Sequence, residues 1–213
     1  MAMKVIALIS QKGGTGKTTL ALNLAVASEL AGKPSAIFDL DPQASSTSWK
    51  DSRESEEPAV LSIHPARIGH YLDMARNNNA GLVIFDTAPH SQKDSLDAAQ
   101  VSDLILIPCK PSLVDLRAIS SSVKVAQLAG KSAVSVLTQV QARSTLTDDA
   151  AEAIKGYGIP IAPVRIGNRA TSFTLGKSVL ETEPLSKASD EIRALYSFII
   201  DIMESKTHDQ TKP

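Results

Sequence analysis

The segment KGGTGKTT, residues 12–19, has the residue types and the spacing that binding of a phosphate group requires. Its glycines allow the backbone to turn several N–H groups toward one anion without Cβ clashes. Lys17 can reach the terminal phosphates of a nucleotide, and the Thr18 hydroxyl can bind Mg²⁺. An apolar helical pattern follows, so a helix dipole would also favour the anion. We predict a phosphate-binding loop; a glycine-rich turn without a ligand is the competing interpretation.

The segment departs from the usual phosphate-loop pattern, G-x-x-x-x-G-K-[ST], at two positions. Gln11 stands where the first glycine is expected, and Lys12 adds a lysine where the loop leaves the preceding apolar run. Lys17 already fills the lysine position at the end of the loop. Lys12 is therefore either a solvated loop residue or a cation with a second task.

Three aspartates stand at or just beyond the ends of two other apolar runs. Asp39 and Asp41 are two residues apart in FDLDP, and Asp86 ends LVIFD. Open α/β sheets bind ligands at the carboxyl ends of their strands, so we expect all three near the loop. A buried carboxylate at Asp86 needs a partner, and a water-mediated link to Mg²⁺ supplies one. For Asp39 and Asp41, a capped turn leading into a helix at 43–50 is the alternative.

The elements that must position these residues alternate along the whole chain. Nearly continuous Val, Ile and Leu runs predict strands that are buried on both faces of a parallel sheet. They lie at 4–9, 35–40, 60–64, 82–86, 103–108 and 133–138, with a weaker candidate at 159–164. Helices are predicted at 17–31, 65–76, 92–101, 112–129, 145–156 and 187–204. This order predicts a single-domain, doubly wound α/β fold, with a mostly parallel sheet and helices on both faces.

Composition limits the classes of function that fit this chain. Its 213 residues, 43% hydrophobic and 21% charged, suit one globular domain, which we assign to 1–205, with a flexible polar tail at 206–213. With a net charge of −1, affinity for nucleic acid must come from a local basic patch. The single cysteine, Cys109, excludes an intrachain disulfide and fits a cytoplasmic setting. The N-terminal apolar run is too short for a secretory signal or a stable membrane insertion.

KGGTGKTT resembles the deviant Walker A motif, KGGxGK[ST], of the ParA/MinD superfamily of dimerising P-loop ATPases. IFDLDPQAS (37–45) is similar to the Walker A′ segment of ParA proteins, and LVIFDTAP (82–89) to their Walker B strand. The resemblance covers essentially the whole chain in element order. Gln11 and the short length make it closest to the small, ParF-like plasmid and chromosome partition ATPases. It implies a P-loop NTPase fold that hydrolyses ATP to ADP and phosphate with Mg²⁺.

The resemblance also implies roles for individual residues. Lys12 would reach the phosphates of a second copy across an ATP-bound homodimer, Lys17 would serve the chain's own nucleotide, and Asp41 would orient the attacking water. The implied metal-binding residues are Thr18, Asp39 and Asp86. The implied nucleotide-binding residues are Gly13, Gly14, Thr15, Gly16, Lys17, Thr18, Thr19 and, beside the adenine, Thr138.

Basic residues without acidic neighbours occupy the stretch from 153 to 180, which contains Lys155, Arg165, Arg169 and Lys177. In ParA proteins the corresponding region helps to form a non-specific DNA-binding surface, so we take Arg165, Arg169 and Lys177 as candidate DNA contacts. Such phosphate contacts are independent of sequence and sensitive to salt. A solvated face with a chance bias of charge is the competing interpretation. The resemblance further implies a ParB-type centromere-binding partner and association with the nucleoid.

Two other classes of function compete with DNA partition. A MinD-like membrane or protein-positioning switch would carry a basic amphipathic helix at its C-terminus, whereas SFIIDIMESKTHDQTKP has mixed charge and a polar end. A metabolic relative, such as an ATP-dependent ligase similar to dethiobiotin synthetase, would lack the lysine at position 12. The sequence therefore favours a partition ATPase, with the positioning switch as the alternative.

Overall fold

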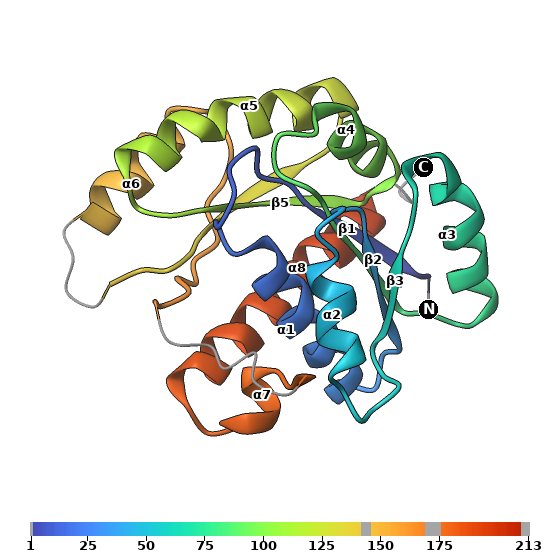
Figure 1. The fold of residues 1–213 in the computed structure, drawn as a ribbon. Coiled ribbons are helices and arrows are strands. Elements are labelled where there is room, and N and C mark those ends of the chain that lie inside the picture. The colour runs from blue at the N-terminus through green and yellow to red at the C-terminus, as the bar shows by residue number, and fades with distance from the viewer. Residues whose placement is uncertain (1, 142–145, 169–175, 210–213) are drawn as a thin grey trace.

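The computed structural model describes residues 2–141, 146–168 and 176–209, and its strands form a single sheet (Figure 1). All strand pairs are parallel, in the order β3-β2-β4-β1-β5-β6. The strands are β1 (Lys4–Leu8), β2 (Ser35–Asp39), β3 (Ala59–Ser62), β4 (Leu82–Asp86), β5 (Leu104–Cys109) and β6 (Ala133–Leu137). The predicted doubly wound α/β fold is confirmed.

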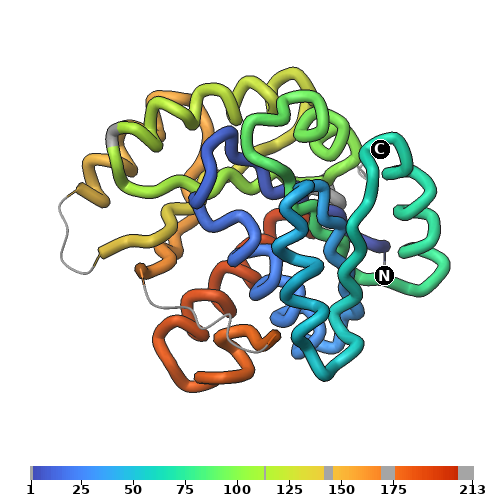
Figure 2. The backbone as a smooth tube through the Cα atoms, in the orientation of Figure 1, coloured from blue at the N-terminus to red at the C-terminus, as the bar shows by residue number. Residues whose placement is uncertain are grey.

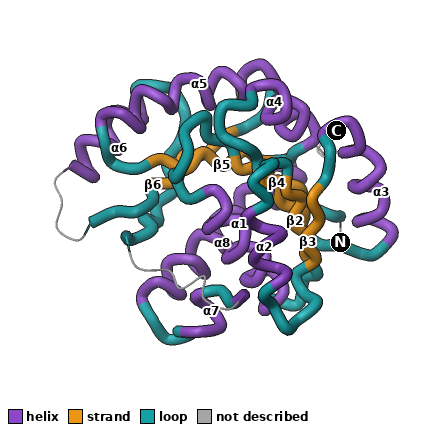
Figure 3. Tube along the Cα trace, viewed as in Figure 1, coloured by secondary structure: helices purple, strands orange, loops and turns teal. Residues whose placement is uncertain are grey.

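Helices cover both faces of this sheet, as the colouring by secondary structure shows (Figure 3). They are α1 (Lys17–Leu30), α2 (Ser45–Asp51), the 3₁₀ turn η1 (Pro65–Arg67), α3 (Ile68–Asn77), α4 (Gln92–Val101), α5 (Leu113–Ala129), α6 (Leu146–Lys155), α7 (Val179–Thr182) and α8 (Lys187–Asp209). Strand side chains alternate between two cores. In β1, Ile6 and Leu8 pack toward α1, α7 and α8, whereas Val5 and Ala7 pack toward α3, α4, α5 and α6.

Three elements differ from the sequence prediction. The weak strand candidate at 159–164 forms only an isolated bridge between Ser135 and Ile161, because Pro160 and Pro163 have no N–H to donate to a ladder. The predicted helix at 65–76 begins as the 3₁₀ turn η1. Helix α7 was not predicted, since four residues are too few to show a helical period.

The apolar side of α8 packs in the hydrophobic core. Ile192, Leu195, Ile199 and Met203 recur at helical spacing, and each is at most 3% exposed. The helix continues to Asp209, into the segment predicted as a flexible tail. Within the described residues, no helix is long and apolar enough to cross a membrane.

The register of the sheet brings the predicted chemistry to one edge. Asp86 at the end of β4 pairs in register with Leu8 of β1 and with Asp39 of β2. The chain leaves β1 through the glycine-rich loop into α1 and leaves β2 into α2, and these two helices lie side by side (Figure 2). The loop, Asp39 and Asp86 therefore meet at the carboxyl ends of the central strands, as expected for this fold class.

Candidate nucleotide-binding site

The glycine-rich loop ends in a conformation that requires glycine. Gly16, the residue before α1, has φ 94° in the left-handed region, and a Cβ there would lie 3.8 Å from two side-chain atoms of Thr138. The backbone thus turns sharply into the helix at Lys17, which leaves the first N–H groups of α1 facing the loop. This geometry suits an anion at the start of α1.

Lys17 directs its charge into the loop. Its Nζ donates to the carbonyl oxygens of Ser10, at 3.2 Å, and Lys12, at 3.4 Å. The residue is only 6% exposed. Burial lowers the pKa of Lys17, and the nearby charges of Asp86 and Asp41 oppose that shift. Neutral carbonyl groups only partly compensate a buried ammonium, so a phosphate in the loop would supply the missing counter-charge.

Asp86 is a buried carboxylate at this edge, at 1% exposure. Its Oδ2 accepts hydrogen bonds from the hydroxyls of Thr18, at 2.7 Å, and Ser46, at 2.8 Å. Its Oδ1 is buried without a hydrogen-bond partner among the described residues. Burial raises the pKa of Asp86 to about 6, and the two hydroxyl donors oppose the shift. Sequence reasoning missed Ser46, whose only signal was its place just after the Walker A′-like segment.

Asp39 holds the first turn of α2. Its Oδ1 accepts from the N–H of Asp41 at 3.0 Å, and its Oδ2 accepts from the N–H groups of Ser46 and Thr47 at 3.1 and 3.3 Å. Burial raises the pKa of Asp39, and these N–H donors oppose the shift. Asp39 therefore caps the first turn of α2, in agreement with the alternative interpretation of FDLDP as a capped turn before a helix. Asp41 is half-buried beside it and accepts from the N–H of Gln43 at 2.9 Å.

Lys12 has a different partner from Lys17. Its Nζ lies 2.8 Å from Oδ2 of Asp115 on α5, and the Ser112 hydroxyl donates to the same oxygen. The side chain of Lys12 is 35% exposed, whereas that of Asp115 is 3% exposed. The second lysine of the motif is thus held by a buried carboxylate that sequence reasoning did not single out. Its signal was the segment KPSLVDLR, residues 110–117, which leads into α5.

Thr138 contacts the loop itself. Its hydroxyl donates to the carbonyl of Thr15 at 2.7 Å, and the side chain of the next residue, Gln139, donates to the carbonyl of Gly14 at 2.8 Å. The segment after β6 therefore braces the loop from the side. Contact between Thr138 and an adenine stays a prediction.

Two basic residues of the predicted DNA-binding stretch have acidic partners among the described residues. Arg165 pairs with Asp148 of α6 at 2.6 Å, and Lys155 pairs with Glu152 at 2.8 Å. Lys177 is exposed, and Arg169 lies outside the described residues. A stretch without acidic residues in the sequence thus has acidic partners in space, supplied by the preceding helix.

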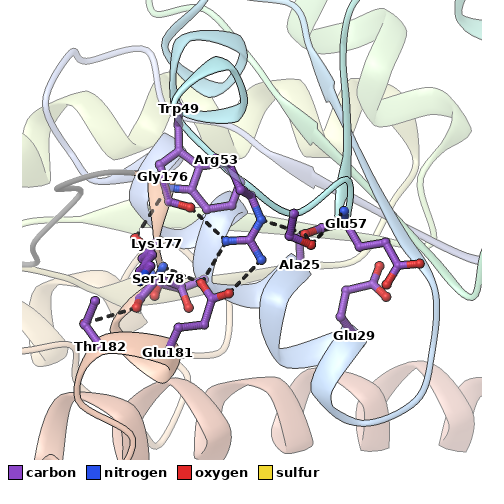
Figure 4. Close-up of polar contacts among 12 residues, drawn as sticks. Ala25, Glu29, Trp49, Arg53, Glu57, Gly176, Lys177, Ser178, Glu181 and Thr182 are labelled. Carbon is purple, nitrogen blue, oxygen red and sulfur yellow. Dashed lines mark hydrogen bonds and ion pairs between the residues drawn. The ribbon is translucent and has the colours of Figure 1, made fainter.

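Arg53 fixes the far end of α2 (Figure 4). Its guanidinium donates to both carboxylate oxygens of Glu181, at 2.7 and 2.9 Å, and to the carbonyls of Gly176 and Glu57, at 2.8 and 2.6 Å. It also lies 4.8 Å from the centre of the Trp49 ring. Gly176 has φ +67°, and a Cβ there would come within 2.6 Å of the Arg53 backbone, so this close approach requires glycine.

The donor set at the carboxyl edge fits Mg²⁺ better than a metal that needs a protein cage. The described residues contain no group of three His, Cys, Asp or Glu side chains that could hold a metal ion. Mg²⁺ commonly keeps several waters and binds phosphate oxygens with one or two protein oxygens. The Thr18 hydroxyl and the unpartnered Oδ1 of Asp86 are oxygens of that kind.

Comparison with known proteins identifies the family. The model of the CobQ/CobB/MinD/ParA nucleotide-binding domain matches residues 6–183. The chain belongs to this family. The match includes the loop, both aspartate segments, β6 and α7, and it confirms the resemblance predicted from the motifs.

Individual members of the family show how far the likeness extends. Maintenance of carboxysome distribution protein A of Halothiobacillus neapolitanus is 29% identical over 214 residues, which cover 92% of this chain and 95% of that protein. The chromosome-partitioning ATPase Soj of Thermus thermophilus is 35% identical over 119 residues, 52% of this chain and 47% of Soj. The structure of the cell division ATPase MinD of Pyrococcus furiosus has a TM-score of 0.73 at 20% identity, covering 94% of this chain and all of that chain. The structural likeness establishes the fold alone.

Proposed function

We propose that this protein is an ATP-dependent, dimerising ATPase that segregates DNA in the cytoplasm. In its ATP state the dimer would bind non-specific DNA, and a ParB-type partner would stimulate hydrolysis and release. The family, the two lysines of the loop and the likeness to Soj support this proposal.

The observation that carries the proposal is the separation of Lys12 from Lys17. Lys17 points into the chain's own loop, while Lys12 is held outside it by Asp115. Since Lys12 is partly exposed, it can exchange Asp115 for an anion presented by a second copy. A lysine supplied in trans would act like an arginine finger, which stabilises charge that develops during phosphoryl transfer.

The remaining residues would bind and orient the reactants. Lys17 and the N–H groups at the start of α1 would hold the phosphates, and half-buried Asp41 would orient the attacking water. Thr18 would bind Mg²⁺ directly and Asp86 through water, while Asp39 supports both through the turn that it caps. Bound Mg²⁺ would neutralise phosphate charge.

Binding to non-specific DNA and to anionic liposomes, measured side by side with ATP and with ADP, tests this function. We expect dimers in light scattering with ATP, DNA binding that requires ATP, and weakening of that binding between two salt concentrations. A monomer with both nucleotides, or equal DNA binding with ATP and ADP, would contradict the proposal.

A protein-positioning switch is the second candidate, and the likeness to the carboxysome-distribution protein favours it. Such a protein could use the same ATP cycle with a protein body as cargo. A membrane-bound version is less well supported, because the apolar side of α8 packs in the core. Liposome binding with ATP in the assay above would favour the membrane version, whereas DNA binding fits either cargo. Pull-down of the ATP-bound dimer with a purified cargo adaptor would then distinguish a DNA cargo from a protein cargo.

A further inference from the structure

Ser46 is a buried hydroxyl that the proposed mechanism does not yet use. It lies in the first turn of α2, is fully buried, and donates to Oδ2 of Asp86 at 2.8 Å. Its own N–H donates to Oδ2 of Asp39 at 3.1 Å. One residue of α2 therefore contacts both buried carboxylates at the carboxyl edge of the sheet.

The Ser46 hydroxyl determines which oxygen of Asp86 remains available. A carboxylate oxygen has two lone-pair sites, and Oδ2 of Asp86 already accepts from Thr18 and Ser46. Oδ1 is buried and has no partner in the described part of the chain. The two hydroxyls thus fix the rotation of the carboxylate and leave Oδ1 as its free acceptor.

Contacts at both ends of α2 hold Ser46 in place. At the N-terminal end, Asp39 accepts from two N–H groups of the first turn, and its negative charge lies where the helix dipole favours it. In the last turn of α2, Trp49 donates to the carbonyl of Lys177 at 3.4 Å, and just beyond the helix Arg53 binds Glu181 (Figure 4). Ser46 therefore presents its hydroxyl to Asp86 from a helix anchored on both sides.

We infer that Ser46 is a positioning residue for the proposed Mg²⁺–nucleotide site: it orients Asp86 so that Oδ1 stays available as the acceptor that would help to hold the ion. This inference rests on the proposed function. Hydrogen-bond partners of metal-site carboxylates contribute about 10–100-fold to metal affinity in other proteins. Ser46 also connects α2, which follows the Walker A′-like segment, with the Walker B-like strand β4.

The test is a titration of ADP binding with MgCl₂ for wild type, Ser46→Ala and Ser48→Ala. Ser48 is an exposed serine on the same helix and serves as the matched control. We expect Ser46→Ala to raise the MgCl₂ concentration for half-maximal enhancement of ADP binding by about tenfold. Its ADP affinity in EDTA should equal that of wild type, and Ser48→Ala should match wild type throughout.

Thermal unfolding in EDTA separates positioning from a purely structural role. A purely structural hydroxyl would lower the melting temperature of Ser46→Ala and leave its MgCl₂ dependence unchanged, which would overturn the inference. If ADP binding by the wild type itself shows no dependence on MgCl₂, the proposed function fails instead. The two failures are therefore distinguishable.

Discussion

Lys12 and Lys17 stand in one motif but have different electrostatic environments. Lys17 is buried, and its pKa is lowered by that burial, so it gains most from an anion bound in its own loop. Lys12 is partly exposed and paired with the buried carboxylate of Asp115. Moving Lys12 to a phosphate would leave the Asp115 carboxylate without its ammonium partner, although the hydrogen bond from the Ser112 hydroxyl would remain. Exchange of partners therefore requires a strongly charged incoming anion, such as a nucleotide phosphate.

The substitution Lys12→Ala tests this division of roles. We expect ADP and ATP affinity to stay within about threefold of wild type, because Lys17 and the helix N-terminus provide the phosphate contacts. Stimulated ATP turnover should fall by about 100-fold or more, as when a charged group that stabilises the transition state is removed. Steady-state phosphate release with the stimulating partner measures this.

Lys17→Ala is the matched comparison for that experiment, since it should abolish nucleotide binding itself. Stimulated turnover by Lys12→Ala at the wild-type rate would exclude a role for Lys12 in trans.

At the scale of elements, α2 connects the carboxyl edge of the sheet with α7. Its N-terminal turn contacts Asp39 and Asp86, and the residues at its other end contact the segment 176–181. Helix α7 also binds α1, because the N–H of Val179 donates to the side chain of Asn23 at 3.1 Å. The helices that leave the nucleotide site are thus joined at their far side by one short segment.

Glu181→Gln should weaken this junction. It replaces a two-oxygen ion pair with Arg53, whose side chain is 7% exposed, and we expect a loss of about 1–2 kcal/mol in unfolding free energy at pH 7. Chemical denaturation measures the change, and Glu183→Gln, at an exposed position nearby, is the control. Equal stability of Glu181→Gln and wild type would show that the ion pair contributes nothing.

The ion pair between Arg53 and Glu181 should make the unfolding free energy depend on pH. Partial burial alone would raise the pKa of Glu181, but hydrogen bonds from Arg53 and from the Ser178 N–H outweigh it and lower the pKa below its ordinary value of 4.5. The contribution to stability is therefore present above about pH 4.5 and is lost as the pH falls through the lower folded-state pKa. The stability difference between wild type and Glu181→Gln should shrink over that acidic range, and a constant difference would contradict the assignment.

For the whole molecule, charge is nearly balanced in the sequence, and several basic residues form ion pairs in the described part of the chain. The net charge is −1, and Arg165 and Lys155 already have acidic partners on α6. One chain would bind DNA weakly, whereas an ATP-bound dimer would present two such surfaces and bind more tightly through avidity. The bound nucleotide would thereby control the affinity for DNA. A strongly basic chain would bind DNA in every nucleotide state, so modest local charge suits a switch.

The double substitution Arg169→Gln and Lys177→Gln tests the DNA surface. Loss of two phosphate contacts per chain should weaken ATP-dependent DNA binding and lower the slope of log K against log salt by about 2 per chain. Arg165→Gln is the comparison; because Arg165 is paired with Asp148, we expect a smaller effect. Unchanged affinity and slope in the double variant would place the DNA contacts elsewhere.

The sequence by itself determined the six strands, most of the helices and the position of the glycine-rich loop. Apolar runs, proline and glycine act on their own segment, so their consequences can be predicted without knowing what packs beside them. The short α7 and the missing strand at 159–164 show the limit of such local signals.

Only the tertiary structure decided which side chains are partners. Lys12 meets Asp115 across 103 residues of sequence, Asp86 meets Ser46 across 40, and Arg165 meets Asp148 across 17. These contacts depend on strand register and on helix placement over the sheet, which no local pattern contains. The physical reason is that the fold decides which charged and hydrogen-bonding groups pack against a given side chain. In a different packing, the same loop lysines would pair with different carboxylates.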